Sequence, residues 1–168
     1  MKMVEREIIV DKLRLVYEGL FSVPELYKLI DEWFRMKGYD KREKKNVEIV
    51  KPNGKYIEIS LEPWKKVTDY ARNVIGIKLV MQNITEVEVE KDNLKVKLNK
   101  GKVALVFDGY LETDYEHRWE GSPMFYFIRT LFDKYFYKPF TAGFETGVKE
   151  DTMTLYNTIK SFLNLYRY

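Results

Sequence analysis

Apolar and charged residues alternate from residue 84 to residue 107, and this period of two predicts antiparallel strands. A two-residue turn at Asp92-Asn93 would align apolar with apolar and acid with base across the hairpin. The aligned pairs are Glu90 with Lys95, Val89 with Val96, Glu88 with Lys97 and Val87 with Leu98. A second turn at Lys100-Gly101 would then place Leu98 opposite Val103, Val96 opposite Leu105 and Leu94 opposite Phe107. The pattern predicts a three-stranded meander with its valines, leucines and Phe107 on one inner face, beneath C-terminal helices.

Other segments carry the same kind of strand pattern. Residues 8–21 alternate until Gly19 interrupts them, and residues 71–82 place Ile75, Ile77, Leu79 and Met81 on one face. Residues 47–50 and 56–61 flank Pro52-Asn53-Gly54, which is a strong hairpin signal. The last strand of the meander is expected to extend to about residue 115. The stretch Pro63-Trp64-Lys65-Lys66 breaks the alternation and is expected to form a loop or a short helix.

Helix signals stand near both ends of the chain. Ser22 as N-cap, Pro24 in the first turn and Glu25 three residues after the cap predict a helix that ends at Gly38. Its inner stripe comprises Leu26, Leu29, Ile30 and Trp33. The C-terminal third predicts one helix from Ser122-Pro123 that stops before Pro139, then a loop containing Gly143 and Gly147, then a last helix from about Asp151.

These elements predict an α+β fold in a single domain spanning residues 1–168. We expect a curved antiparallel sheet of about six to seven strands, with an N-terminal helix and two aromatic-rich C-terminal helices packed on it. The order of elements resembles the helix-grip superfamily of START and Bet v 1-like proteins. That resemblance implies a sheet that wraps a long C-terminal helix and holds an apolar ligand in the gap between them.

Composition limits the classes of function. The chain of 168 residues is 45% apolar and 33% charged, as in soluble globular proteins, and its aromatic content of 15% is high. The absence of cysteine excludes disulfides, thiol catalysis and thiolate metal sites. No signal peptide and no apolar run long enough to span a membrane is seen. We therefore expect a cytoplasmic protein without membrane contact, and abundant Lys and Glu with a single Gln favour a thermophilic source.

Catalytic signatures are absent from the sequence. No phosphate-binding glycine loop and no nucleophile elbow occurs. Glu112, Asp114 and Glu116 alternate on one strand face and could collect a divalent ion, but we expect a solvated outer face that pairs with nearby Lys or Arg instead. His117 has no obvious nucleophile beside it. We expect no catalytic residue, no metal and no cofactor, and thus a non-catalytic binding protein.

Basic residues gather in one segment. Residues 35–55 hold eight basic and three acidic side chains, a local net charge of +5, while the whole chain carries +3. Two aromatic-basic stretches, residues 63–72 and 164–168, add rings beside cations, the combination that binds single-stranded nucleic acid. The predicted RNA-binding residues are Lys41, Arg42, Lys44, Lys45, Trp64, Lys65, Lys66 and Arg72.

The predicted helix at residues 123–138 is apolar around most of its circumference and must be covered on two sides. Simple burial explains this, and a subunit interface or the wall of an apolar cavity are the alternatives, with Phe125, Phe132 and Phe136 on the second stripe. Three functions follow. Association with RNA or a ribonucleoprotein particle ranks first, and a helix-grip carrier of an apolar ligand is the alternative. An interface or scaffolding role, for example in a homodimer, comes third.

Overall fold

The structure is a computed structural model that describes residues 5–69, 71–113 and 137–166, with no side-chain description for Glu5 or residues 137–142. The described residues form six strands and two helices. The strands are β1 (Glu5–Phe21), β2 (Glu43–Lys51), β3 (Gly54–Leu61), β4 (Trp64–Lys66), β5 (Ala71–Lys91) and β6 (Leu94–Thr113). The helices are α1 (Val23–Met36) and α3 (Tyr137–Asn164).

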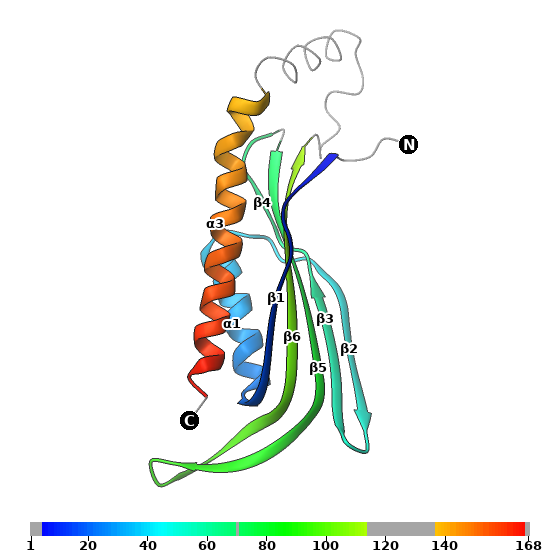
Figure 1. Cartoon of the computed structure of the whole chain (residues 1–168), viewed down its shortest axis with the longest axis vertical. Coiled ribbons are helices and arrows are strands. Elements are labelled where there is room, and N and C mark those ends of the chain that lie inside the picture. The colour runs from blue at the N-terminus through cyan, green and yellow to red at the C-terminus, as the bar shows by residue number, and fades with distance from the viewer. Residues whose placement is uncertain (1–4, 70, 114–136, 167–168) are drawn as a thin grey trace.

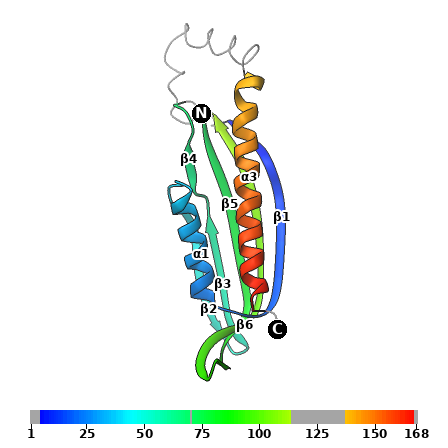
Figure 2. The same cartoon turned by 90° about the vertical axis from the view of Figure 1, so that its left-hand side faces the viewer.

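All strands pair antiparallel in one sheet with the order β1-β6-β5-β3-β2, and β4 pairs separately with β5. Both helices lie side by side on the same face of this sheet (Figure 1, Figure 2). The core lies between these two layers, where alternate residues of the central strands meet α1 and α3. Its fully buried members include Ile77, Leu105, Phe107, Leu155 and Ile159. The opposite face of the sheet carries no helix among the described residues.

The first half of the predicted meander is confirmed. Asp92 and Asn93 have positive φ angles of 53° and 63°, the conformation of a tight hairpin turn. The four predicted pairs, Glu90 with Lys95, Val89 with Val96, Glu88 with Lys97 and Val87 with Leu98, occur in this register.

The second predicted turn is wrong. Lys100 and Gly101 lie inside β6, which continues without a turn, so Val103, Leu105 and Phe107 pair with Met81, Leu79 and Ile77 of β5. Gly101 marks a β-bulge instead, because the register shifts between Gln82 and Thr85 on the opposite strand. A Cβ atom at Gly101 would lie 2.9 Å from the Gln82 carbonyl oxygen. The glycine therefore serves a close backbone approach, which the sequence pattern cannot distinguish from a turn.

The same correction changes which faces are covered. Side chains alternate along a continuous strand, so Leu94, Val96 and Leu98 of β6 point to the face opposite Val103 and Phe107. The predicted single inner face is therefore wrong. Val103 and Phe107 are fully buried, whereas Leu94 is 68% exposed and Val96 is 38% exposed. We call the free part of the hairpin, residues 85–98, the arm; Figure 1 shows it extending beyond the other strands and curving towards the helix side.

Most of the other predicted strands are present. β1 contains Gly19, and the stripe of Ile75, Ile77, Leu79 and Met81 is buried as predicted. The hairpin at Pro52-Asn53 joins β2 and β3, with Lys51 opposite Gly54. The expectation of a loop or helix at residues 63–66 is wrong, because β4 forms there against residues 72–74 of β5.

The N-terminal helix is confirmed in detail. The Ser22 side chain accepts a hydrogen bond from the Glu25 backbone N–H, and Gly38 follows the helix with a φ of 81°. The predicted stripe is correct, since Leu26, Ile30 and Trp33 are buried. No helix in the described part of the chain is both long and apolar enough to cross a membrane.

The predicted fold class is wrong in its helical layer. Where two C-terminal helices separated by a loop were expected, α3 runs unbroken from Tyr137 to Asn164 through Pro139, Gly143 and Gly147. Pro139 is tolerated because it lies in the first turn, where its missing N–H is not needed. The glycines are tolerated because tertiary packing stabilises helices more than propensity does. Most of the other predicted helix, residues 123–136, lies outside the described residues.

Packing of α3 depends on a close approach to the sheet. A Cβ at Gly109 of β6 would lie 2.8 Å from Val148 and 3.0 Å from the Thr152 hydroxyl. Only glycine leaves room for the helix at this point. Thr152 satisfies its own hydroxyl by donating to the Val148 carbonyl at 2.7 Å.

Candidate functional site

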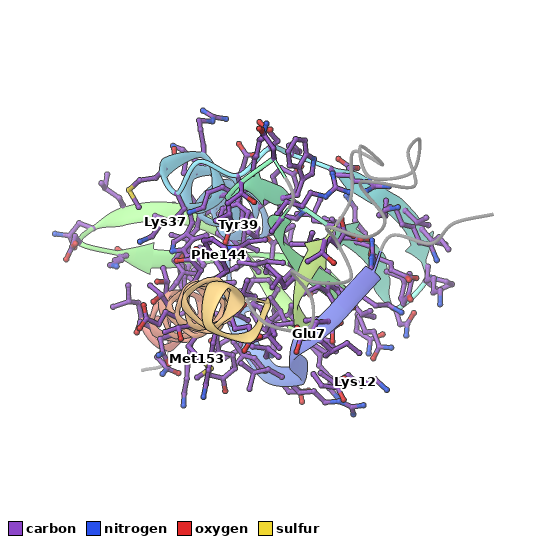
Figure 3. The ribbon with its side chains drawn as sticks, turned by 90° about the horizontal axis from the view of Figure 1, so that it is seen from above. Glu7, Lys12, Lys37, Tyr39, Phe144 and Met153 are labelled. Carbon is purple, nitrogen blue, oxygen red and sulfur yellow. The ribbon has the colours of Figure 1, made fainter. Side chains whose placement is uncertain are left out.

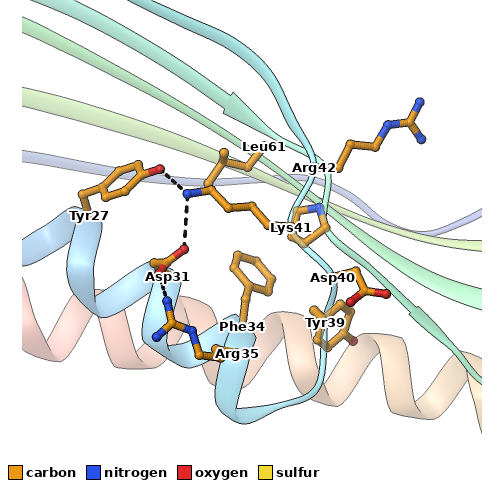
Figure 4. A pocket seen from close by; sticks show the side chains of 10 residues that line it. Tyr27, Asp31, Phe34, Arg35, Tyr39, Asp40, Lys41, Arg42 and Leu61 are labelled. Carbon is orange, nitrogen blue, oxygen red and sulfur yellow. Dashed lines mark hydrogen bonds and ion pairs between the residues drawn. The ribbon is translucent and has the colours of Figure 1, made fainter.

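A groove of about 210 Å³ lies where the C-terminal half of α1 faces the chain that follows it. Tyr27, Asp31, Phe34 and Arg35 line it from α1, and Leu61 and Pro63 line it from the end of β3 (Figure 4). The remaining walls come from the connection after the helix, residues 39–42. Aromatic rings and charged groups thus share one small concave surface.

Backbone hydrogen bonds hold the connection in place. Asp40 donates to the Trp64 carbonyl at 2.7 Å and accepts from the Trp64 N–H at 3.2 Å, and Glu62 donates to the Arg42 carbonyl at 2.7 Å. The segment before β4 therefore acts as a neighbouring strand for residues 40–42. This pairing brings Lys41 over the face of α1 that carries Tyr27 and Asp31.

One carboxylate in the groove, that of Asp31, interacts with two cations. Asp31 accepts a hydrogen bond from Arg35 at 2.7 Å and lies 3.4 Å from the Lys41 ammonium (Figure 4). Lys41 also donates to the Tyr27 hydroxyl at 2.8 Å and lies 5.1 Å from the centre of the Tyr27 ring. The Tyr27 hydrogen bond raises the pKa of Lys41, burial opposes this rise, and the charge of Asp31 adds to it. Lys41 is therefore cationic and held at the groove wall.

Arg42 differs from its neighbour. It is exposed, has no ion-pair partner among the described residues, and projects away from the groove wall in Figure 4. Counting the lining residues, Arg35, Lys41 and Arg42 stand against Asp31 and Asp40, an excess of one positive charge. The guanidinium of Arg42 is the part of this charge that no described side chain neutralises.

Lys44 and Lys45 continue the basic edge along β2, which is the edge strand of the sheet. Lys45 lies 3.1 Å from Glu58, and its hydrogen bond, with a second one from Tyr56, lowers the pKa of Glu58. Lys44 lies 3.9 Å from Glu62. The Lys44 and Lys45 side chains are 42% and 51% exposed, whereas Glu62 and Glu58 are only 17% and 13% exposed. Each carboxylate has a second cation, because Arg6 lies 2.5 Å from Glu62 and Lys78 lies 3.6 Å from Glu58. If a lysine turned to another anion, its carboxylate would therefore keep a partner.

Trp64 and Arg72 lie together on the helix-free face of the sheet. The Arg72 guanidinium lies over the Trp64 ring at 5.0 Å and donates to Glu112 at 2.5 Å. Glu112 is 1% exposed and also pairs with Arg6 at 2.6 Å. Arg72 is therefore engaged in a buried ion pair, and Trp64 is covered by it.

Lys65 points to the other side, towards α3. Its ammonium donates to the Lys37 carbonyl at 3.2 Å, lies 3.7 Å from Asp151 and stands over the Tyr39 ring at 5.0 Å. Lys66 is exposed and lies 2.7 Å from Asp69. The eight predicted RNA-binding residues are thus divided: Lys41, Arg42, Lys44 and Lys45 share one edge, while Lys65 and Arg72 hold the fold together.

Sequence reasoning missed the aromatic wall of the groove. Tyr27 and Phe34 follow the helical spacing that also places Asp31 and Arg35 beside them, but this spacing describes any exposed helix face. These residues form a groove because residues 40–42 pair with residues 62–64, and no local sequence pattern predicts that pairing.

The apolar ligand cavity that the helix-grip resemblance implies would lie at the sheet–helix interface. In the described part of that interface, the core residues Leu105, Phe107, Leu155 and Ile159 are fully buried. Phe125, Phe132 and Phe136, the predicted interface or cavity residues, lie outside the described residues. So do Asp114, Glu116 and His117 of the candidate metal site. Among the described residues, no group of three or more His, Cys, Asp or Glu side chains is placed to hold a metal.

No protein-family model matches the chain, and no curated protein matches its sequence. The resemblance to helix-grip proteins therefore rests on the order of elements, and the function has to be argued from the geometry of the site.

Proposed function

We propose that this protein binds single-stranded RNA, free or within a ribonucleoprotein particle, at the groove beside α1. The observation that carries the proposal is Arg42, an exposed guanidinium without an acidic partner among the described residues, at the rim of an aromatic groove. Arginine is suited to phosphate because its planar donors match two oxygens at once. The other groove residues supply surfaces for a base.

The groove offers an unpaired base a ring to stack on. Tyr27 is partly exposed, while Phe34 and Tyr39 line the groove but are only 5% and 6% exposed. Stacking on an aromatic side chain contributes about 1–3 kcal/mol per base and tolerates any base. The expected recognition is therefore of single strands without a strong sequence preference.

The backbone of the RNA would follow the edge of the sheet. Arg42, Lys44 and Lys45 are cations close together at the start of β2, and the carboxylates that pair with the two lysines each have a second cation. Phosphates can compete for these lysines, and each contact releases counterions. Trp64, Lys65 and Arg72 are not part of this path because they are engaged within the fold.

The charge test compares two triple variants with the same change in net charge. Arg42→Ala/Lys44→Ala/Lys45→Ala removes the proposed phosphate contacts, and Lys91→Ala/Lys95→Ala/Lys97→Ala removes three cations from the arm. Fluorescence anisotropy with a short labelled RNA should show weaker binding for the first triple only, and the slope of log K against log salt should flatten by about 2. If the two triple variants weaken RNA binding equally, the protein attracts RNA by its general charge and not at the groove.

The stacking test compares two tyrosines. Tyr27→Leu removes the ring from the groove, and Tyr56→Leu removes an equivalent ring from β3, outside it. We expect Tyr27→Leu to weaken RNA binding about tenfold, the effect of losing one stacked base, and Tyr56→Leu to leave it unchanged. Thermal unfolding of both variants checks that the fold is intact. RNA binding that is undetectable at low salt, or unaffected by Tyr27→Leu, contradicts the proposal.

A further inference from the structure

A second hollow, of about 260 Å³, lies at the turn between β2 and β3, and we call it the turn hollow. Its walls carry two cations and three side-chain amides, and none of its described wall residues is acidic. These residues are Lys51, Asn53, Gly54, Lys55, Tyr56, Gln82 and Asn83. Figure 1 shows the turn at the end of the sheet from which the arm extends. The turn hollow is thus a basic, polar surface at the opposite end of β2 from the groove.

Close contacts fix the shape of the turn hollow. A Cβ atom on Gly54, whose φ is 132°, would lie 2.7 Å from the backbone carbonyl carbon of Asn83, so the turn lies directly against β5. The Asn53 side-chain amide donates to the Asn83 side-chain oxygen at 2.8 Å. Asn83 has a φ of 57° and lies in the bulge between Gln82 and Thr85. The turn of one hairpin is therefore joined to the bulge of the next, and this contact builds the turn hollow.

Two lysines of the turn hollow are accessible to an anion. Lys51 is exposed and has no ion-pair partner among the described residues, and its ammonium lies 5.1 Å from the centre of the Tyr56 ring. Lys55 lies 3.0 Å from Glu48, but both side chains are 51% exposed, and such pairs contribute little to stability. Glu48 stays solvated if Lys55 turns to another anion. Both lysines can therefore contact a phosphate.

The groove and the turn hollow lie at opposite ends of one exposed edge strand. Arg42 and Lys51 are nine positions apart, which corresponds to about 30 Å of strand. Every residue of β2 is at least partly exposed, and Ile49 and Val50, at 46% and 76%, offer apolar contacts to bases. Residues 42–55 hold five basic and two acidic side chains, a net charge of +3. The edge is therefore an exposed, positively charged surface long enough for several nucleotides.

The two ends of this edge open on different faces of the sheet. Figure 3 shows Tyr39, one wall of the groove, between α1 and α3, where its hydroxyl donates to Asp151. The groove is therefore on the helix side. Ile57 belongs to the core, so its neighbour Tyr56 and the Lys51 ammonium over the Tyr56 ring lie on the helix-free face. A ligand that contacts both ends must pass around the edge strand, as a flexible chain with many charges can.

We propose that the turn hollow binds a phosphate of the same RNA strand, which runs along β2 from the groove, around the sheet edge, to Lys51 and Lys55. This inference rests on the proposed RNA binding at the groove. Two sites that hold one strand bind it more tightly than either site alone, because the second contact is intramolecular. A stacked strand advances about 3.4 Å per nucleotide, so about nine nucleotides cover the edge of about 30 Å. Affinity therefore continues to rise with RNA length after the groove is filled.

The test combines two RNA lengths with two matched double variants. Lys51→Gln/Lys55→Gln changes the turn hollow, and Lys91→Gln/Lys97→Gln removes the same charge from the arm. In each pair, one lysine has an ion-pair partner among the described residues and the other has none. Fluorescence anisotropy measures the binding of labelled oligouridines of about 4 and about 12 nucleotides, which are within the usual size range of single-strand sites.

The turn-hollow variant should weaken binding of the longer RNA about tenfold and flatten its slope of log K against log salt by about 1.4, the effect of two lost phosphate contacts. Binding of the shorter RNA should not change, because it fills the groove without reaching the turn hollow. The arm variant should alter neither. In the wild-type protein, the side-chain amide resonances of Asn53 and Asn83 should shift with the longer RNA only, and thermal unfolding checks the fold of both variants.

Four results overturn the inference. Wild-type binding of both RNAs with equal losses from the turn-hollow variant at the two lengths, or with equal effects of the turn-hollow and arm variants on the longer RNA, contradicts the second site and leaves the groove proposal standing. Unchanged Asn53 and Asn83 resonances with the bound longer RNA do the same, even if a variant fails to fold. If neither RNA binds the wild-type protein at low salt, the groove proposal and this inference both fail.

Discussion

The two halves of the β5–β6 hairpin have the same alternating sequence pattern and opposite surroundings. In the upper half, residues 71–81 pair with residues 103–113, between the neighbouring strands and beneath α3. In the arm, residues 87–91 pair with residues 94–98, and no other described strand lies beside them. Phe107 is fully buried, whereas Leu94 is 68% exposed. Alternation thus specifies that two strands pair, and it does not specify whether either face is covered.

Charged residues show the same contrast. Glu112 in the upper half is 1% exposed and is held by Arg6 and Arg72. Glu86 in the arm is 62% exposed, and its partner Lys97 is 76% exposed. The first carboxylate depends on its partners because it has no water to replace them. The second is solvated with or without its lysine.

The largest expected difference between the halves is in apolar packing. Phe107→Ala should lower the free energy of unfolding by about 4 kcal/mol, because it leaves a cavity among Leu105, Leu155 and Tyr156. Val96→Ala in the arm should cost less than about 1 kcal/mol, because the side chain is already exposed. Urea unfolding measures both. A large cost for Val96→Ala would mean that the arm packs against another molecule.

The buried carboxylate comes next. Glu112→Gln should cost about 3 kcal/mol, since it leaves Arg72 partly buried without its counter-charge. Glu86→Gln is the matched change in the arm and should be neutral within about 0.5 kcal/mol. Thermal and urea unfolding of the two variants test the contrast, and similar stabilities would remove the argument that Glu112 is a structural ion pair.

One added methyl group at Gly101, at the junction between the halves, should lower the free energy of unfolding. Gly101→Ala should cost about 1–3 kcal/mol, because its Cβ would lie 2.9 Å and 3.0 Å from the carbonyl oxygens of Gln82 and Asn83. Gly143→Ala in α3 is the control, with no atom within 4 Å of its Cβ, and should stabilise by up to about 1 kcal/mol through helix propensity. If Gly101→Ala is tolerated equally, the bulge is not held by close backbone contact.

The smallest effect is expected for the ion pairs of the arm. Lys97→Ala removes a contact of 3.3 Å to Glu86 and should change the free energy of unfolding by less than about 0.5 kcal/mol. Added salt should make the difference vanish, because both side chains are exposed. A cost above about 1 kcal/mol, or one that persists in high salt, would show that the arm is held more rigidly than a solvated ribbon.

Local chemistry predicted the elements whose partners are close in sequence. The Asp92-Asn93 turn and its four pairs follow from residues within a short hairpin, and the α1 cap follows from Ser22 and Glu25 alone. Sequence also indicated the basic edge, since Lys41, Arg42, Lys44 and Lys45 are neighbours in the chain. In each case the interacting groups lie only a few residues apart in the chain, so the local sequence is enough to predict their arrangement.

Only the tertiary structure decided which contacts form between segments that are distant in sequence. Gly101 is a bulge rather than a turn because β6 finds a long partner in β5, and α3 passes through Gly143 and Gly147 because the sheet supports it. Pairing of residues 40–42 with residues 62–64 made the groove and left Arg42 without an ion-pair partner in the described part of the chain, while Arg72 pairs with Glu112. Burial and charge neutralisation depend on which surfaces meet, and that is settled by contacts across the whole chain rather than by any local pattern.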